Sequence, residues 1–520
     1  MNSTVLLFLA LYFLAMLAVG IVAMRRGGSS SMEGYYLSGR NVGPLVTAMT
    51  MQSTSMSGYM FLGAGSLGYT QGYYGFWYAA GDIGGGVVNL SVLGRRMRKL
   101  SQIMGALTSI EYLEKRYPSK WVRLISAVLS VFLLGAYVLA QFIAGGKGLE
   151  MVTGLPYEAS LLIAVAVILA YTLMGGYGAV AYTDLLQSLV MLVGIVWILF
   201  ATLQEVGGLT AANEALATLD PTLLSVWGRD LAYEGQWGIV LGALLIFSIG
   251  YMGWPHVVTR HMAMRNPFHA RRAGVYSTLW NLVFVSAPYI LGTLAILVLP
   301  DLDDPEQAIF ALAQNLLPAA VVGIVMAAIM AAIMSTADSI LLQTGSIAAR
   351  DLYERFINPR MEEKQMVRVS QLIVLLLGMA CAVIALFEPP AVFSIVVFTT
   401  SVLGSAFLPA YVAAVWWKKA NTPGALASII VGAVVAFLWK YLGLEAATEI
   451  HPMLAGLVLS SVTMVAVSLA TQRQYPVPEH ILRAMEETEE LRPLPRSLAS
   501  RQSFEMAHEA LTLKSAERPT

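Results

Sequence analysis

The segment TAMTMQSTSMSGYMFLGAGSLG (residues 47–68) decides the fold, because it is long enough to cross a membrane but polar in its middle. Six hydroxyl or amide side chains fall between Thr50 and Ser57, and Gly58 follows them directly. One or two such residues can bond back to their own helix, but a cluster beside glycine favours unwound backbone. Unwound backbone at membrane depth needs protein or water around it. The segment therefore predicts a broken helix facing a cavity, and tight helix packing through small residues is the alternative.

The composition of the whole chain favours a membrane protein. Of its 520 residues, 57% are hydrophobic and 12% are charged, whereas a soluble domain carries about 25% charged residues. So few charged residues cannot cover the surface of a water-soluble protein. We therefore expect a lipid bilayer as the main partner. The formal net charge is +0, which gives no indication of a nucleic-acid partner.

Apolar runs of membrane-spanning length recur along the chain, and we count about thirteen. They lie near residues 4–24, 43–66, 72–94, 122–147, 157–178, 183–204, 236–257, 275–299, 317–347, 369–387, 391–416, 423–442 and 452–471. Basic residues gather after alternate runs, as in RRMRK at 95–99 and at Arg260 and Arg265 after the seventh run, and the opposite loops hold almost none. By the positive-inside rule, the N-terminus lies outside and the C-terminus lies in the cytoplasm.

A second run is also interrupted, at LLIFSIGYMGWPHVV (residues 244–258), where Gly250, Gly253 and Pro255 break the helical pattern. The alternative is a proline kink near the interface with Trp254 as an anchor. Two broken spans, five spans apart, are typical of inverted-repeat transporters, whose sites lie near the bilayer midplane. The sequence thus predicts an all-α polytopic protein with a five-plus-five inverted-repeat core.

This reading divides the chain into six parts. They are a first transmembrane helix and cytoplasmic loop (1–42), a first inverted repeat (43–204), an extracellular loop (205–235), a second inverted repeat (236–416), two C-terminal transmembrane helices (417–472) and a cytoplasmic tail (473–520). Residues 101–117 predict an amphipathic helix on the cytoplasmic surface. The charged tail predicts a flexible segment too short for a catalytic domain.

The ninth run, AAIMAAIMSTADSILLQTGSIAARDLY (327–353), carries Ser335, Thr336, Asp338 and Ser339 in an otherwise apolar helix. A carboxylate inside the membrane costs about 2.5–3.5 kcal/mol, and no basic residue lies nearby in this run. A hard cation bound by oxygens is the natural partner; protonation of Asp338, or a bond to a neighbouring helix, is the alternative. Asp184 either joins such a site or, with the preceding threonine, caps a helix.

The chain contains no phosphate-binding loop and no histidine pair with metal or haem spacing. We therefore expect neither an enzyme nor an ATP-driven pump. A coupled ion must supply the energy for transport.

Five motifs make the chain similar to the sodium:solute symporter family over roughly residues 4–470. They are YYLSGRNVGP (35–44), STSMSG (53–58), LMGGYGAVAYTDLLQ (173–187), GYMGWPH (250–256) and MAAIMSTADSILL with a following RDLY (330–353). Within the family, the chain most resembles the sodium/proline and sodium/pantothenate symporters. The stretch 140–158 resembles the pantothenate branch, and the stretch 250–263 resembles the proline branch.

The resemblance implies a sodium site between the second and ninth runs and a ten-span core with extra spans around it. The carbonyl ligands would be Ser53, Met56 and Ala332, and the hydroxyl ligands Ser335 and Thr336. A second sodium site, present in some members, would use Asp184, Ser335, Asp338 and Ser339. Solute contacts fall on Ser57, Tyr137, Phe247, Tyr251 and Trp254, and coupling or gating on Arg40, Ser55 and Gly58.

The chain departs from the proline symporters at three of these positions. Those proteins carry Asp where this chain has Ser55, Trp where Phe247 aligns, and a hydroxyl residue where it has Asp338. We hypothesise that Asp338 compensates electrostatically for the carboxylate missing at Ser55. The departure at Phe247 weakens the case for proline itself.

The resemblance implies sodium-coupled symport of a small organic solute across a bacterial cytoplasmic membrane, with sodium as coupling ion and no other cofactor. Proline is the favoured solute, and pantothenate or another small monocarboxylate is the alternative. A transporter-like sensor and an ion channel are the competing classes. The residues give no indication of an oligomeric state.

Overall fold

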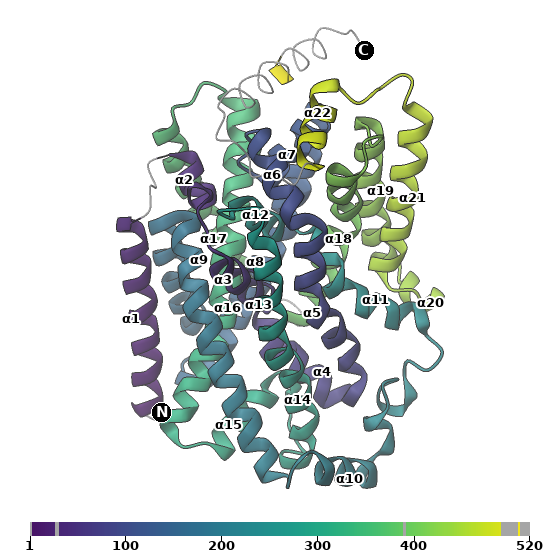
Figure 1. Cartoon of the computed structure of the whole chain (residues 1–520). Helices are drawn as coiled ribbons and strands as arrows, with labels where there is room; N and C mark the ends of the chain where they lie inside the picture. Colours follow the sequence, from purple (N-terminus) through teal and green to yellow (C-terminus); the bar gives the residue numbers. More distant parts are fainter. Residues whose placement is uncertain (1–2, 27–30, 388–391, 490–507, 510–520) are drawn as a thin grey trace.

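The computed structural model describes residues 3–26, 31–387, 392–489 and 508–509. These residues form helices joined by turns, and their one β-type contact is an isolated bridge between Val42 and Met264. Figure 1 shows the long helices side by side between two ends of the molecule. The N-terminus and α10 (Leu209–Leu219) lie toward one end, and α22 (Glu479–Glu489) lies at the other. The predicted all-α class is confirmed.

Within the described residues, nine helices are long and apolar enough to cross a membrane. They fall on α1 (Ser3–Arg26), α8 (Lys120–Thr153), α9 (Tyr157–Glu205), α13 (His269–Phe284) with α14 (Ser286–Val298), α16 (Ala319–Ile347), α17 (Glu363–Ala385), α18 (Val392–Trp416), α19 (Thr422–Tyr441) and α21 (Pro452–Thr471). The predicted runs at 43–66, 72–94 and 236–257 consist of shorter helices. The predicted number of spans therefore stays a prediction.

The first predicted break is confirmed at Met56. Helix α3 (Pro44–Ser55) ends there, and Met56 has φ −89° and ψ 69°, outside the helical region. Helical structure resumes at Gly58 and continues through η2 (Met60–Ala64) and α4 (Gly65–Gln71). A continuous, tightly packed helix is excluded for this segment.

The second predicted break is also confirmed. Helix α11 (Trp237–Ser248) passes into the short turn η7 (Gly250–Gly253), and Trp254 is extended at φ −93° and ψ 116°. A new helix, α12 (Pro255–Ala263), begins at Pro255, where the missing N–H of proline costs no hydrogen bond. The chain is therefore broken here and not merely kinked.

Helix α9 bends at Gly176, whose φ of 59° is left-handed. A side chain there would strain the backbone and would lie 2.7 Å from the ring of Tyr35. The helix continues beyond the bend, and the Thr183 hydroxyl donates to the Ala179 carbonyl at 3.1 Å. Asp184 thus lies in the middle of a helix, and the interpretation of Thr183 and Asp184 as a helix cap is wrong.

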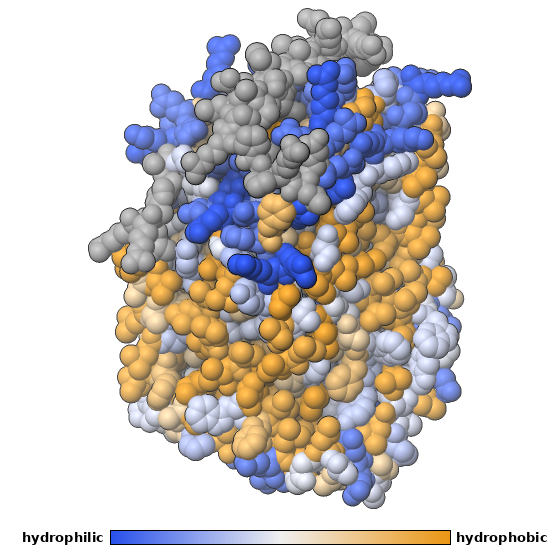
Figure 2. Space-filling view, in the orientation of Figure 1, coloured by the Kyte–Doolittle hydropathy of each residue, from blue (hydrophilic) through white to orange (hydrophobic). Residues whose placement is uncertain are grey.

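Figure 2 shows apolar side chains over the sides of the molecule and hydrophilic side chains gathered toward its ends. Large apolar side chains point outward from this band, including Phe132 at 65% and Phe200 at 61% exposure. So many exposed apolar groups require lipid around them. We call the end with the denser hydrophilic cover the basic end; it carries α2 (Met32–Leu37), α6 (Arg95–Ile103), α7 (Ser109–Arg116) and α22.

Part of the predicted flexible tail is ordered as α22, which packs on the basic end. The Nζ of Lys418 lies 3.4 Å from Glu486 and 3.3 Å from Glu489, and Lys99 donates to the Glu487 carbonyl. Ile481 and Met485 of α22 are fully buried. The expectation of a flexible tail was wrong for residues 479–489, because the helix pairs acidic residues with the basic loops. Residues 490–507 and 510–520 lie outside the described residues.

Candidate functional site

Two hydroxyls of α16 donate hydrogen bonds to the end of α3, at the first break. The Ser335 hydroxyl donates to the Ser53 carbonyl at 2.9 Å and to the Ala332 carbonyl at 3.2 Å. The Thr336 hydroxyl donates to the Thr54 carbonyl at 2.9 Å and to the Ala332 carbonyl at 3.2 Å. Every one of these residues is fully buried. The structure thus brings four predicted sodium-site residues together and adds the Thr54 carbonyl as a fifth oxygen.

The residues around the first break lie close to neighbouring helices, which explains why a glycine stands at position 58. Met56 is the residue at which α3 unwinds, and Ser55 is buried in its last turn. The Gly58 N–H donates to the side-chain oxygen of Gln141 at 3.0 Å. A Cβ on Gly58 would lie 2.8 Å from the side chain of Ile333 on α16. Glycine therefore lets the broken helix approach the hydroxyl-bearing helix closely.

Asp338 and Ser339, predicted for a second sodium, lie about one helical turn further along α16, and Asp184 meets them from α9. One oxygen of Asp184 accepts from Thr50 at 2.5 Å and from Ser339 at 3.2 Å. The other oxygen of Asp184 and both oxygens of Asp338 are buried with no hydrogen-bond partner. The two carboxylates present three unpaired oxygens in the interior, and such groups are costly there unless a cation or a proton joins them.

Arg260 is a residue of this site that sequence reasoning assigned to a loop. Its side chain is 2% exposed, and its Nη2 lies 3.7 Å from the Asp184 carboxylate. The same nitrogen donates to the Thr54 hydroxyl at 2.5 Å and to the Ser339 hydroxyl at 2.8 Å. The sequence held one indication of this position. His256 and Arg260 are four residues apart, so they share one face of a helix that continues from the second break. A guanidinium thus provides one positive charge inside the site.

The predicted solute contacts lie together around the two breaks. The Tyr137 hydroxyl lies 3.4 Å from the Ser57 hydroxyl. Tyr251 and Trp254 meet edge to face at a ring separation of 4.5 Å. Phe247 stacks on Tyr59 at 5.0 Å. Trp254 also stacks on His256 at 5.7 Å. We call Tyr59, Tyr137, Phe247, Tyr251, Trp254 and His256 the aromatic cluster.

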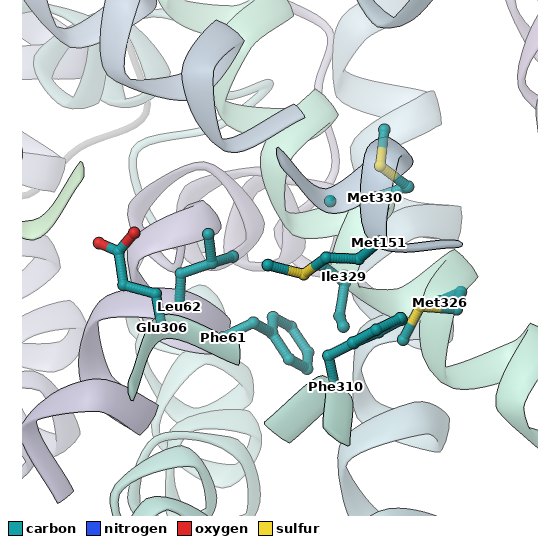
Figure 3. Close-up of a pocket in the computed structure, with 9 residues that line it drawn as sticks. Phe61, Leu62, Met151, Glu306, Phe310, Met326, Ile329 and Met330 are labelled. Carbon is teal, nitrogen blue, oxygen red and sulfur yellow. The ribbon is translucent and has the colours of Figure 1, made fainter. Parts of the chain in front are cut away.

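A small pocket lies between η2, α8, α15 (Ala308–Leu316) and α16. It is lined by Phe61, Leu62, Gly148, Met151, Glu306, Phe310, Met326, Ile329 and Met330. Figure 3 shows the phenylalanine and methionine side chains that line the pocket, with the Glu306 carboxylate to one side. Glu306 pairs with Lys147 at 2.6 Å. Apart from Glu306, the lining of the pocket is apolar.

Arg40, predicted to serve coupling or gating, is buried at the basic end. Its guanidinium donates to the carbonyl of Ala106 at 2.5 Å and to the carbonyl of Met262 at 3.0 Å. It also pairs with Glu33 at 2.8 Å. The side chain therefore joins the segment before α3 to the α6–α7 turn and to α12.

At the same end, a network of ion pairs joins α7, α8 and η9 (Ala348–Ile357). Arg123 pairs with Glu114 at 2.7 Å and with Asp351 at 2.8 Å, and Arg350 pairs with Glu111 at 3.1 Å. Burial opposes ionisation of Glu111, but Arg350 and the other nearby cations outweigh it and hold its pKa well below the usual range. Helix α7 is therefore buried within the basic end, whereas the sequence predicted a helix on the surface.

Replacing Arg123 with Met is expected to loosen the basic end. Removing one partner of a buried ion pair costs about 3–5 kcal/mol, because the other charge stays buried. A cysteine at Ser109, which is fully buried, introduced in a Cys381→Ala background, should then react faster with a polar thiol reagent. Lys120→Met, at the exposed start of the same helix, is the matched control. Equal labelling rates in both variants would show that the network does not hold this end closed.

The model of the sodium:solute symporter family matches residues 35–432. The osmoregulated proline transporter OpuE of Bacillus subtilis is 28% identical, covering 91% of this chain and 96% of that protein. A sodium/proline symporter of Haemophilus influenzae is 29% identical, covering 90% and 95%.

Two solved structures share the fold. A Na+-coupled sialic acid symporter, in a substrate-bound outward-open state, aligns with a TM-score of 0.75 at 19% identity, covering 91% of this chain and 98% of that one. A transporter of the nucleobase-cation-symport-1 family aligns with a TM-score of 0.56 at 15% identity, covering 87% and 98%. At these identities the likeness concerns the fold alone.

Proposed function

The chain belongs to the sodium:solute symporter family, and we propose that it carries a small organic solute across the cytoplasmic membrane together with sodium. The observation that carries this proposal is the contact of the Ser335 and Thr336 hydroxyls with the unwound end of α3. Carbonyl and hydroxyl oxygens at the end of a half-helix are the ligands by which such transporters coordinate sodium. Sodium would lie between these carbonyl and hydroxyl oxygens, with the hydroxyl protons turned away from the carbonyls, and would hold α3 and α16 together.

Proline is the solute that we propose, because the relatives over nearly the full length are proline transporters. Pantothenate or another small monocarboxylate is the alternative. The aromatic cluster between the two breaks would contact the solute. We propose that the basic end faces the cytoplasm, in accordance with the positive-inside rule. The chain then exposes its N-terminus outside and α22 inside, in the inner membrane of a bacterium.

The energetics of this cycle are sufficient for accumulation. A membrane potential of 100 mV contributes about 2.3 kcal/mol per sodium ion, and a tenfold sodium gradient contributes about 1.4 kcal/mol. Together they support about 500-fold accumulation of a neutral solute. A second sodium at Asp184, Asp338 and Ser339 would square this ratio.

Uptake into liposomes tests the proposal. The purified protein should accumulate labelled proline when an inward sodium gradient is imposed, and not when potassium replaces sodium. Unlabelled proline should compete, and pantothenate should not. Accumulation of pantothenate instead would change the solute, and uptake that is independent of sodium would contradict symport.

Deleting residues 473–520 is expected to leave most of the sodium-dependent uptake. The ion pairs of α22 with Lys418 are exposed, and exposed pairs contribute about 0.2–1 kcal/mol each. Initial uptake rates, normalised to the amount of reconstituted protein, measure the effect. Loss of uptake by a correctly inserted protein would indicate that α22 takes part in the transport cycle.

A further inference from the structure

Asp82 is a buried carboxylate to which the sequence assigned no role. It lies on α5 (Phe76–Asn89), within the glycine-rich stretch GDIGGG at residues 81–86. A Cβ on Gly81 would lie 2.3 Å from the Leu244 carbonyl, and one on Gly85 would lie 2.2 Å from the Phe247 carbonyl. These glycines therefore allow α5 to pack closely against α11, just before the second break. This contact places Asp82 in the aromatic cluster.

Both oxygens of Asp82 face aromatic residues of the two broken helices. One accepts from the Tyr59 hydroxyl at 2.8 Å, and the other accepts from the Tyr251 hydroxyl. Asp82 is fully buried, and none of the ion pairs formed by the described residues includes it. Two phenol donors favour the ionised carboxylate but add no positive charge. A buried carboxylate inside a membrane protein is costly unless a positive group or a proton joins it.

Two further side chains near the breaks carry buried nitrogen atoms that have no hydrogen-bond partner. Tyr137 and Gln141 lie four residues apart on α8 and share one face. The Gln141 side-chain nitrogen has no hydrogen-bond partner, and neither do the two ring nitrogens of His256. The His256 ring lies 6.3 Å from the Tyr137 ring. The cluster thus combines a buried carboxylate with nitrogen groups that can donate hydrogen bonds.

We propose that Asp82 binds the ammonium group of the transported solute and restricts transport to solutes that carry an amine beside a hydrogen-bond acceptor. The proposal rests on the proposed symport function and deepens it. An ammonium group gains both the carboxylate charge and the faces of Tyr59, Tyr251 and Trp254, which attract cations. The Gln141 amide and His256 then receive the acceptor end, such as a carboxylate. Amino acids with a primary or secondary amine meet both requirements.

This assignment separates the two candidate solutes. Proline carries a secondary ammonium and a carboxylate, whereas pantothenate and simple monocarboxylates carry no ammonium group. An anionic solute without an amine would instead approach a buried carboxylate and be repelled by it.

Matched solutes test the assignment in the wild-type protein. Tetrahydrofuran-2-carboxylate retains the ring and carboxylate of proline but has an ether oxygen in place of the amine. It should compete with labelled proline at least about 100-fold more weakly than unlabelled proline does, because an unpaired buried polar group penalises the wrong ligand. Equal competition, or sodium-driven accumulation of pantothenate, would overturn the proposal without the need for any variant.

Variants of Asp82 provide a second test of the assignment. Asp82→Asn should raise the KM for proline at least about tenfold and reduce the preference for proline over tetrahydrofuran-2-carboxylate. Sodium alone should still raise its melting temperature, as in the wild type, and Asp82→Glu should retain part of the discrimination. Asp303→Asn changes an exposed carboxylate and is the matched control.

The remaining outcomes are distinct. An unchanged KM in Asp82→Asn would overturn the assignment of Asp82. Loss of the sodium-induced stabilisation in that variant, with proline binding intact, would make Asp82 an ion ligand and overturn it as well. A wild-type protein that accumulates no solute under a sodium gradient would contradict the proposed symport, and this inference with it.

Discussion

In the double variant Ser335→Ala/Thr336→Ala, the sodium concentration that half-saturates uptake is expected to rise at least about 100-fold. The two hydroxyls lie 2.9 Å from carbonyls of the broken helix α3 and provide two oxygens of the proposed sodium site. A hydrogen bond or ligand contact to a charged group contributes about 1.5–3 kcal/mol. Losing two of them corresponds to a factor of about 100 or more, since 1.4 kcal/mol is tenfold. Sodium titration of proline uptake in liposomes measures the shift.

The matched control lies on the same helix. The Thr344 hydroxyl is buried and donates to the Ile340 carbonyl of its own helix at 2.7 Å. Thr344→Ala therefore removes the same chemical group without removing a contact to α3, and its sodium dependence should match the wild type. Membrane insertion should be equal in both variants. Normal sodium dependence in the double variant would refute the assignment of Ser335 and Thr336.

The two breaks could be predicted from the sequence because each depends on local chemistry. Gly58 follows a cluster of hydroxyl residues, and Pro255 follows Gly250 and Gly253. Such clusters of residues favour an interrupted helix. The hydroxyls of α16 were predictable for a related reason, because Ser335 and Thr336 lie in an otherwise apolar helix. Local patterns therefore located both sides of the proposed sodium site.

The partners of the buried charges could not be predicted in the same way. Asp82 and Tyr251 are 169 residues apart in the chain, and Arg260 and Thr54 are 206 apart. Helical periodicity gives the face on which a residue lies but not the helix that packs against that face. Arg260 was therefore counted with the basic loops, and Asp184 was open to interpretation as a cap. The tertiary structure shows that they lie together.

Replacing Arg260 with Gln is expected to reduce sodium-dependent uptake at least about 100-fold, which corresponds to about 3 kcal/mol. The guanidinium is the positive charge nearest to the Asp184 carboxylate, at 3.7 Å, in the interior of the protein. Removing one partner of a buried pair leaves the other charge buried without compensation. Asp184→Asn should be similarly damaging, since it leaves the guanidinium unpaired. Uptake rates and melting temperatures of the reconstituted single variants measure both effects.

The double variant Asp184→Asn/Arg260→Gln distinguishes a charge pair from two independent contributions. If the charges compensate each other, removing both should cost less than the sum of the single changes, in melting temperature and in uptake. Arg265→Gln, whose guanidinium makes an exposed contact with Asn41, is the control for loss of a nearby arginine. The Thr54 and Ser339 hydroxyls, which accept from Arg260, would remain beside Asp184 in the Arg260→Gln variant. Sodium binds to such oxygens, so raising the sodium concentration should partly restore uptake by this variant. Strictly additive effects and no rescue by sodium would show that Arg260 acts through packing rather than as a cation inside the site.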